Sequence, residues 1–260
     1  MKKQKMYLLF ACLISMAVAC KKTEDVLPGN SATQDGVSAD AATQNAPDAN
    51  RCIDPNDFVS GVNNPFFPLN VGETLHYLTT TIAGTDTSYE NVDFIVTNQT
   101  KIIQGVTCMV VHDVVTWNGT LIEDTYDWFA QDDDGNVWYF GEDTKKYDSN
   151  GNYSTLGSWE SGVDGARAGY QMWAHPRAHI GQTYKQEYYA GIAEDKAKVI
   201  NGNVNVSVPY GSFQNCIKIK EFSPLAPGVN GFKYQKAGIG MVRSATPSEG
   251  ESAVLISITH

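Results

Sequence analysis

The residues whose chemistry stands out lie between positions 158 and 195, where carboxylates alternate with aromatic side chains. They are Trp159, Glu160, Asp164, Trp173, Glu187, Tyr188, Glu194 and Asp195. Two carboxylates that face each other across a cleft could carry out glycoside hydrolysis. Without a cleft, the same side chains suit sugar binding, because aromatic faces stack on sugar rings and carboxylates accept hydrogen bonds from hydroxyl groups. A third interpretation is structural, with the aromatic residues packed in the core and the acids in turns or ion pairs.

Two other clusters could hold a metal ion. The run Asp132-Asp133-Asp134-Gly135-Asn136 offers the oxygen ligands that calcium prefers, but its glycine is fourth rather than sixth, and the same residues form tight turns without a metal. His175 and His179 are four residues apart, a zinc spacing on a helix, but no glutamate stands between them. We therefore expect no metal site and no cofactor.

The motifs of several enzyme classes are missing from the sequence. It contains no Gly-x-Ser-x-Gly nucleophile elbow, no Walker A motif and no dinucleotide-binding glycine pattern. Cys108 and Cys216 lie in strand-like runs, where a reactive thiolate is not expected. Whether the protein is an enzyme stays open at this level.

The N-terminus predicts a lipoprotein. A basic start, Met1 to Lys5, precedes an apolar run from Tyr7 to Val18 that is too short to span a bilayer. The following Ala17-Val18-Ala19-Cys20 resembles the bacterial lipobox, which implies removal of residues 1–19 as a signal peptide and lipidation of Cys20, with palmitate among the acyl chains expected. An ordinary signal peptide cut near Ala19 is the alternative.

The residues after Cys20 bear on the location. Lys21-Lys22-Thr23-Glu24-Asp25 resembles the surface-export signal of Bacteroidetes lipoproteins, and position 21 is not aspartate. This resemblance implies an outer-membrane lipoprotein, with exposure at the cell surface left open. The membrane, contacted through the lipid on Cys20, is the first expected partner.

Charge and cysteine usage narrow the partners further. Removal of residues 1–19 takes away three lysines, so the formal charge changes from −10 to −13, which excludes nucleic acid as an expected partner. Cys52, Cys108 and Cys216 would remain besides the lipidated Cys20. They could form one disulfide, but buried free thiols in strands are the favoured interpretation.

The chain divides into a tether and a domain. Residues 20–57 are predicted to be a disordered tether, because they contain no aromatic residue and are rich in small polar residues. Residues 58–260 are predicted to form a single β-rich domain. Strands are expected at 72–77, 89–98, 107–117, 123–131 and 137–140, with short helices at 164–171 and 192–199.

The second half of the domain repeats the first. Five anchor residues recur in the same order at offsets of 105 to 109, among them the pair Cys108 and Cys216 and the pair Val137 and Val242. The halves are about 70–141 and 180–260, with an unrepeated insert at 142–180. We therefore expect a mainly β fold, an antiparallel sandwich or incomplete barrel built from two duplicated meander-like halves.

One stretch carries a family resemblance. Asp127-Trp128-Phe129-Ala130-Gln131-Asp132, followed by Gly135-Asn136-Val137-Trp138-Tyr139-Phe140-Gly141-Glu142-Asp143-Thr144, resembles an uncharacterised family of bacterial secreted proteins and lipoproteins. The resemblance extends over about residues 63–258 and implies a secreted bacterial domain, without implying an activity or site residues.

These features predict a lipid-anchored cell-envelope protein that acts as a noncatalytic binding module for a glycan or a hydrophobic ligand. The alternative is an envelope hydrolase that uses a carboxylate pair in the 158–195 region. A cleft with two facing acids, one of them desolvated, would favour the hydrolase, and an apolar concave surface would favour the hydrophobic ligand.

Overall fold

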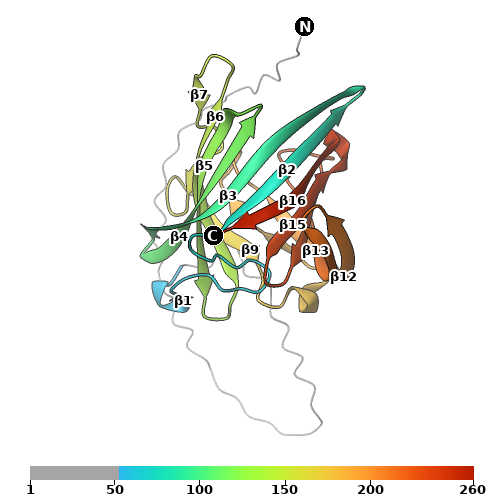
Figure 1. Ribbon diagram of the computed structural model, residues 1–260. Helices are drawn as coiled ribbons and strands as arrows, with labels where there is room; N and C mark the ends of the chain where they lie inside the picture. Colours follow the sequence, from blue (N-terminus) through green and yellow to red (C-terminus); the bar gives the residue numbers. More distant parts are fainter. Residues whose placement is uncertain (1–52) are drawn as a thin grey trace, which may run out of the picture. The chain divides into compact units, whose positions relative to one another are not determined.

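The computed structural model describes residues 53–260, which form an antiparallel β domain (Figure 1). The predicted signal peptide, Cys20 and most of the predicted tether lie outside the described residues. Defined structure begins at Ile53, and a short 3-10 helix, η1 (Pro55–Asp57), precedes the expected start of the domain. Within residues 53–260, no helix has the length and apolar character needed to cross a bilayer.

The first half of the domain is a meander of long strands. Its strands are β1 (Phe58–Val59), β2 (Thr74–Ala83), β3 (Asp86–Ile103), β4 (Val106–Trp117), β5 (Thr120–Asp132) and β6 (Val137–Tyr147). The turn between β4 and β5 consists of Asn118 and Gly119, both with positive φ, which matches the twist of a two-residue hairpin. The strands expected from the sequence are all present, and most are longer than expected.

The insert and the start of the second half consist of short strands. The insert holds β7 (Tyr153–Ser154), β8 (Trp159–Glu160), β9 (Arg167–Met172) and a 3-10 helix, η2 (Pro176–His179), and β10 (Thr183–Lys185) and β11 (Glu187–Tyr188) follow it. The short helix predicted at 164–171 is wrong, because β9 occupies most of that range and pairs with β6. A strand partner outweighs the weak helical pattern of so short a segment.

The second half is another meander. Its elements are β12 (Lys196–Val208), β13 (Gly211–Phe222), β14 (Gly231–Lys236), β15 (Gly240–Thr246), the 3-10 helix η3 (Pro247–Glu249) and β16 (Glu251–Thr259). The helix predicted at 192–199 is also wrong, since β12 begins at Lys196. β12 pairs with β13 over nearly its whole length.

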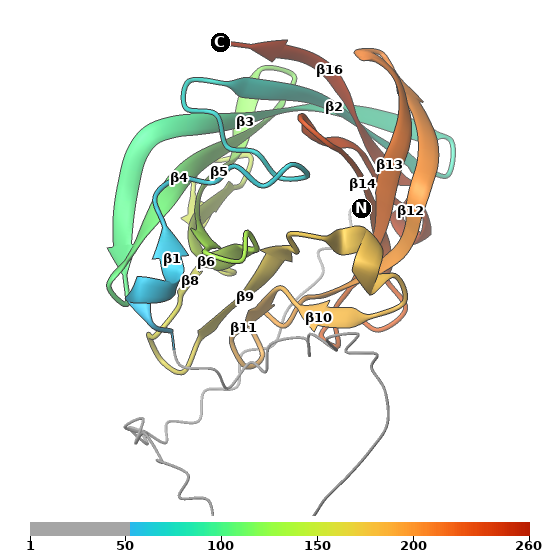
Figure 2. The same ribbon diagram turned by 90° about the horizontal axis from the view of Figure 1, so that it is seen from below.

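The strands form one sheet that curls almost into a closed barrel (Figure 2). Its order is β10-β12-β13-β14-β15-β16-β2-β3-β4-β5-β6-β9-β11, and neighbouring strands are antiparallel. The prediction of a mainly β sandwich or incomplete barrel is therefore confirmed. The last strand of the chain, β16, pairs with β2, so the two meanders are joined side by side.

The two ends of the sheet meet in a short stretch, residues 183–188, which we call the closing segment. Its first part, β10, pairs with β12, and its second part, β11, pairs with β9. Gln186 lies between the two strands, and its backbone N–H donates to the carbonyl of Asp195. The segment thus changes partners at Gln186 and spans the seam of the barrel.

The anchors of the predicted repeat fall on matching strands. Cys108 lies in β4 and Cys216 in β13, and both are fully buried free thiols. Val137 begins β6 and Val242 lies in β15, and both are fully buried. The expectation of buried thiols is confirmed for Cys108 and Cys216, whereas the duplication itself stays a prediction.

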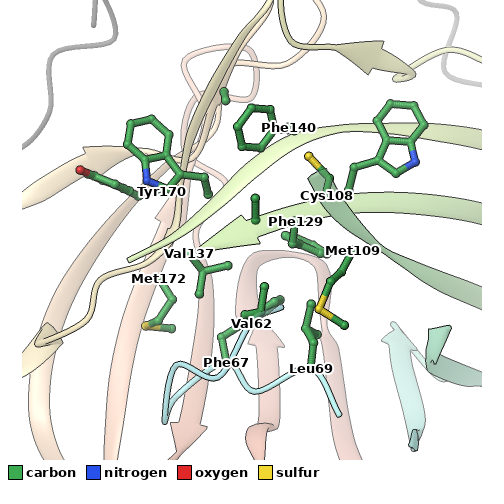
Figure 3. Close-up of a cluster of buried hydrophobic side chains, with 14 of the residues drawn as sticks. Val62, Phe67, Leu69, Cys108, Met109, Phe129, Val137, Phe140, Tyr170 and Met172 are labelled. Atoms are coloured by element: carbon green, nitrogen blue, oxygen red, sulfur yellow. The ribbon is translucent and has the colours of Figure 1, made fainter. Parts of the chain in front are cut away.

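One end of the barrel is filled by residues 62–69, which we call the plug segment. In Figure 2 this part of the chain, between β1 and β2, crosses the end of the barrel. Figure 3 shows Val62, Phe67 and Leu69 pointing from it toward Phe129 and Met109. The Phe67 ring packs edge-on against Phe129 at 5.0 Å between centroids and against Phe94 at 6.2 Å. These contacts bury the aromatic residues that precede the first long strand.

Candidate functional site

A cavity of about 310 Å³ lies inside the barrel above the plug segment. This volume is at the lower end of the range for small-molecule sites. Its apolar lining comes from the plug segment, four strands and the β14–β15 turn: Phe67, Pro68, Leu69, Leu75, Tyr77, Phe94, Phe129, Ile239, Gly240 and Met241. Its polar lining consists of Asp113, Glu123, Thr125, Asp127, Tyr139, Glu142, Gln171, Lys233 and Gln235.

The lining changes from apolar to polar along β5. Alternate residues of a strand point to the same face, so Phe129, Asp127, Thr125 and Glu123 follow one another along the inner wall. Phe129 is buried against the plug, whereas the Glu123 side chain, nearer the β4–β5 hairpin, is 32% exposed. The cavity is therefore apolar at its closed end and acidic toward its more exposed end.

Two of the acids face each other across neighbouring strands. Asp127 on β5 is registered with Glu142 on β6, which places their Cβ atoms roughly 5 Å apart. The hydroxyl of Tyr139 donates a 2.6 Å hydrogen bond to Oδ1 of Asp127. Burial raises the pKa of Asp127 to about 6, against the opposing effect of this hydrogen bond.

Glu142 is harder to ionise than Asp127. Burial, followed by the charge of Asp127, raises the pKa of Glu142 to about 8, although Tyr139 and Lys146 act in the opposite direction. At neutral pH the pair therefore holds one proton on Glu142 while Asp127 is mostly charged. Two like charges so close together cannot both ionise without cost, and a shared site separates their pKa values.

A third acid, Asp113, extends the cluster onto β4. Its strand partner on β5 is Thr125, so it lies one step along the inner wall from Asp127. Burial raises the pKa of Asp113 well above its usual range, and the charges of Asp127 and Glu123 add to the shift. Three strands thus contribute acids to one region of the cavity.

The basic group of the cavity is already paired. Lys233 on β14 forms a 3.0 Å ion pair with Glu221 on β13, and Glu221 also accepts a 2.9 Å hydrogen bond from the side chain of Gln186. Burial alone would lower the pKa of Lys233, but Glu221 outweighs it and the pKa is raised. Lys233 is therefore a charged lysine held against the wall opposite the acids.

One buried acceptor in the lining has no donor. Gln235 on β14 is 2% exposed, and its Oε1 makes no hydrogen bond. A buried amide oxygen without a partner costs about 1–3 kcal/mol. Gln235 is among the residues that line the cavity, although its Oε1 has almost no accessible surface.

Three of the sequence-predicted site residues lie in β8, which pairs with β6, or in the turn after it. Trp159 is buried edge-on against Tyr139, with 5.3 Å between ring centroids. Glu160 forms a 2.7 Å ion pair with Lys101. Asp164 is exposed in a turn with φ of +49°. None of the three lines the cavity.

The other five candidates surround the closing segment. Trp173 is buried, with the rings of His179 and Tyr184 each 4.3 Å away. Tyr188 lies near the cations of Arg167 and Lys185. None of the five candidates lines the cavity, and of the two aromatic side chains Trp173 is buried and Tyr188 is half-buried.

The acids of this group have different roles. Glu194 caps a turn by accepting a hydrogen bond from the backbone N–H of Gly191, and Asp195 is exposed. Burial, together with the charges of Asp195 and Glu142, raises the pKa of Glu187 to about 8. Glu187 is therefore the one of the eight candidates that couples to the acids of the cavity through Glu142.

The Asp-rich turn between β5 and β6 is occupied by its own hydrogen bonds. The carboxylate of Asp132 accepts from the backbone N–H of Asn136 at 2.7 Å and from the indole of Trp138 at 2.8 Å. These two hydrogen bonds account for an aspartate at position 132 without a bound cation. Within residues 53–260, no group of three or more His, Cys, Asp or Glu side chains is arranged to hold a metal ion.

Sequence reasoning missed the cavity acids although a signal exists. Glu123, Thr125, Asp127, Phe129 and Gln131 alternate with a period of two, which places them on one face of a strand. Acids that alternate along a strand usually lie on its solvent-exposed face. The pattern therefore shows that these side chains share one face of the strand, but it does not show that this face points into the barrel.

The comparisons with known proteins find a few remote structural similarities. No protein-family model matches the chain, and no curated protein matches its sequence. A "putative exported protein with YmcC-like fold" from Bacteroides fragilis is 16% identical, with a TM-score of 0.45, over 75% of this chain and 99% of that one. A "putative lipoprotein" from Parabacteroides distasonis is 13% identical, with a TM-score of 0.41, over the same shares of the two chains. At these values neither similarity identifies a function.

Proposed function

We propose that the protein is a noncatalytic binding module that holds a small, largely hydrophobic ligand inside the barrel. The observation that carries this proposal is the cavity of about 310 Å³, closed by aromatic side chains at one end and lined by polar groups at the other. Concave sites of this kind, mostly apolar with a few convergent polar groups, are typical of ligand binding. The site thus lies in the barrel rather than in the insert.

The proposal includes a location in the cell envelope. It rests on the lipobox-like Ala17-Val18-Ala19-Cys20 and on the residues after it, which favour an outer-membrane lipoprotein. In that arrangement, the lipid on Cys20 holds the chain at the membrane and the barrel remains in the aqueous phase. A module of this type would bind its ligand close to a bilayer.

The test uses 1-octanol, a neutral amphiphile matched to the cavity, which has room for roughly ten water-sized groups at ~30 Å³ each. Binding should shift the NMR methyl signals of Leu75 and Leu69, which line the cavity. Met241→Trp, which places a larger ring in the cavity, should weaken binding about tenfold or more. Thr107→Trp, at an exposed position of β4, should leave it unchanged.

The result against the proposal would be a folded wild-type protein whose methyl signals do not respond to 1-octanol. Equal binding by Met241→Trp would also contradict it, provided that circular dichroism shows this variant to be folded.

A second candidate function is hydrolysis, which the pair Asp127 and Glu142 favours. The two acids are adjacent and their pKa values are separated, as in enzymes that use one carboxyl as acid and the other as nucleophile or base. The pair differs from the one expected in the 158–195 region. Assays with 4-nitrophenyl glycosides distinguish the two functions, since release of 4-nitrophenol that Asp127→Asn abolishes would favour catalysis.

A further inference from the structure

The polar end of the cavity is rich in acceptors and poor in free donors. Four acids line it, Asp113, Glu123, Asp127 and Glu142, together with Gln235, whose Oε1 has no hydrogen-bond partner. Its two strong donors are engaged within the protein. The Tyr139 hydroxyl donates to Asp127, and Lys233 donates to Glu221.

This imbalance distinguishes between classes of ligand. A carboxylate or phosphate group would face the negative charge of Asp127 and would compete with Glu221 for the one lysine in the lining. Like charges brought together in a partly desolvated site cost free energy. A protonated amine brings three donors and no acceptor, which is what the walls lack.

We propose that the cavity selects an amphiphilic cation, with an alkyl or ring portion against Phe94, Phe129 and the plug segment and a protonated amine among Asp113, Asp127 and Glu142. The inference rests on the proposed function, since it names the ligand class of the same cavity. The whole ligand, amine included, has roughly ten non-hydrogen atoms by the volume of the cavity.

Geometry places the amine where three strands converge. Asp127 and Glu142 are opposite each other on β5 and β6, and Asp113 is diagonal to Asp127 on β4. An ammonium group between them can donate to more than one carboxylate at once. The unpartnered acceptor, Gln235, approaches from the opposite wall on β14.

Proton release accompanies binding. Burial favours the protonated forms of Glu142 and Asp113, and a bound ammonium group would favour their ionised forms. The charged and titratable groups around them are Tyr77 on β2, Glu123 on β5, Tyr139 and Lys146 on β6, Glu187 on β11, Asp195 before β12, Glu221 on β13 and Lys233 on β14. Among these, only the two lysines are cations, and both lie beside a glutamate.

The experiment compares three probes of one chain length: octylammonium, 1-octanol and octanoate. Calorimetry should give octylammonium the highest affinity, about tenfold or more above 1-octanol at pH 8, and octanoate the lowest. Octylammonium affinity should rise between about pH 5 and pH 8, by up to tenfold per pH unit for each proton released. Titrations in buffers of different ionisation enthalpy measure that proton release directly.

Two variants and a matched control locate the amine. Glu142→Gln and Asp127→Asn keep the side-chain shapes and should each reduce octylammonium affinity about tenfold or more, with little change for 1-octanol. Asp143→Asn changes the exposed neighbour on the same strand and should alter neither. The amide variants remove ionisable groups that are costly to bury, so folding is preserved.

The outcomes separate the two proposals. If 1-octanol and octanoate bind as well as octylammonium, or if the amide variants keep the affinity for octylammonium, the proposal of a cationic ligand is wrong. The proposal that the cavity binds a hydrophobic ligand would remain. If octyl glucoside binds and octylammonium does not, the ligand is a glycan and the cation is again wrong. If none of the probes binds the folded protein, ligand binding in the cavity fails as well.

Discussion

Burial of the Glu142 carboxyl, which raises its pKa, reduces the stability of the folded protein when this group is ionised. It is partly buried beside Asp127, and each unit by which its pKa exceeds the usual value corresponds to about 1.4 kcal/mol. A glutamate needed only for the fold could be replaced by a glutamine at no such cost. Its presence opposite a second acid is therefore better explained by a ligand or a proton than by packing.

The pH dependence of stability follows from these acids. A carboxyl whose pKa is raised in the folded state stabilises the fold fully below its unfolded pKa near 4, and this contribution is lost as pH rises through the folded pKa. For Asp127 and Glu142 the loss occurs up to about pH 6 and about pH 8. The free energy of unfolding should therefore fall between about pH 4.5 and pH 8, and Glu142→Gln should remove roughly 2–4 kcal/mol of that fall.

Urea unfolding at several pH values measures this effect. Asp143→Asn, on the exposed neighbour of Glu142, should follow the wild type. A wild-type stability that stays level or rises from pH 4.5 to pH 8 would show that Glu142 ionises like an ordinary surface glutamate.

At the level of elements, the closing segment decides whether the barrel is shut. It lies directly against β9, where a Cβ added to Gly169 would come within 2.5 Å of the carbonyl oxygen of Lys185 and 2.7 Å of the carbonyl carbon of Gln186. Backbone atoms cannot yield as a flexible side chain does. Gly169 is thus the position where the seam depends on the absence of a side chain.

Gly169→Ala should therefore loosen the seam. Hydrogen exchange of the amides in residues 183–188 should become at least about tenfold faster, because the substitution separates the segment from β9. Gly231→Ala is the matched control, since an added Cβ in β14 meets nothing closer than 3.8 Å. Unchanged exchange in Gly169→Ala would mean that the seam adapts to the methyl group.

The strands and the inner cavity differ in how far the sequence predicts them. Aromatic and β-branched runs bounded by Asn118-Gly119 or Asp134-Gly135 predict the meander well, because turn chemistry and alternation act locally. The direction of each face depends on how the sheet curls and on register shifts such as the one between Trp128 and Phe129. Those features arise from long-range pairing, so the sequence alone does not show that Asp127 faces the inside of the barrel.

The same dependence on long-range packing explains why the roles of the tryptophans in the insert were not predicted. Trp159 and Trp173 have the residue types of a sugar platform, but both are buried, with exposures of 4% and 3%. Whether an aromatic residue is a platform or a packing residue depends on what covers it, and the covering elements come from other parts of the chain. Glu187 was predicted as a ligand-binding residue; its burial raises its pKa to about 8, but it does not line the cavity.

For the whole molecule, the proposed lipid anchor on Cys20 would hold the barrel and its cavity close to the membrane surface. A Cys20→Ser protein should leave the membrane fraction and appear in the soluble fraction, because the thiol that carries the lipid is missing. The barrel needs no lipid to fold, so the soluble variant should keep the octanol response of the wild type. Fractionation followed by immunoblotting measures the first effect. A variant that stays with the membrane would contradict the lipobox interpretation.

The pairing of β16 with β2 has a consequence for biosynthesis. Thr74 to Thr81 in β2, the first long strand, pair with β3 on one edge, and on the other edge they pair with residues of β16. During synthesis, this second edge of the first meander stays unpaired until β16 has been made. The barrel therefore cannot close before β16 has been synthesised.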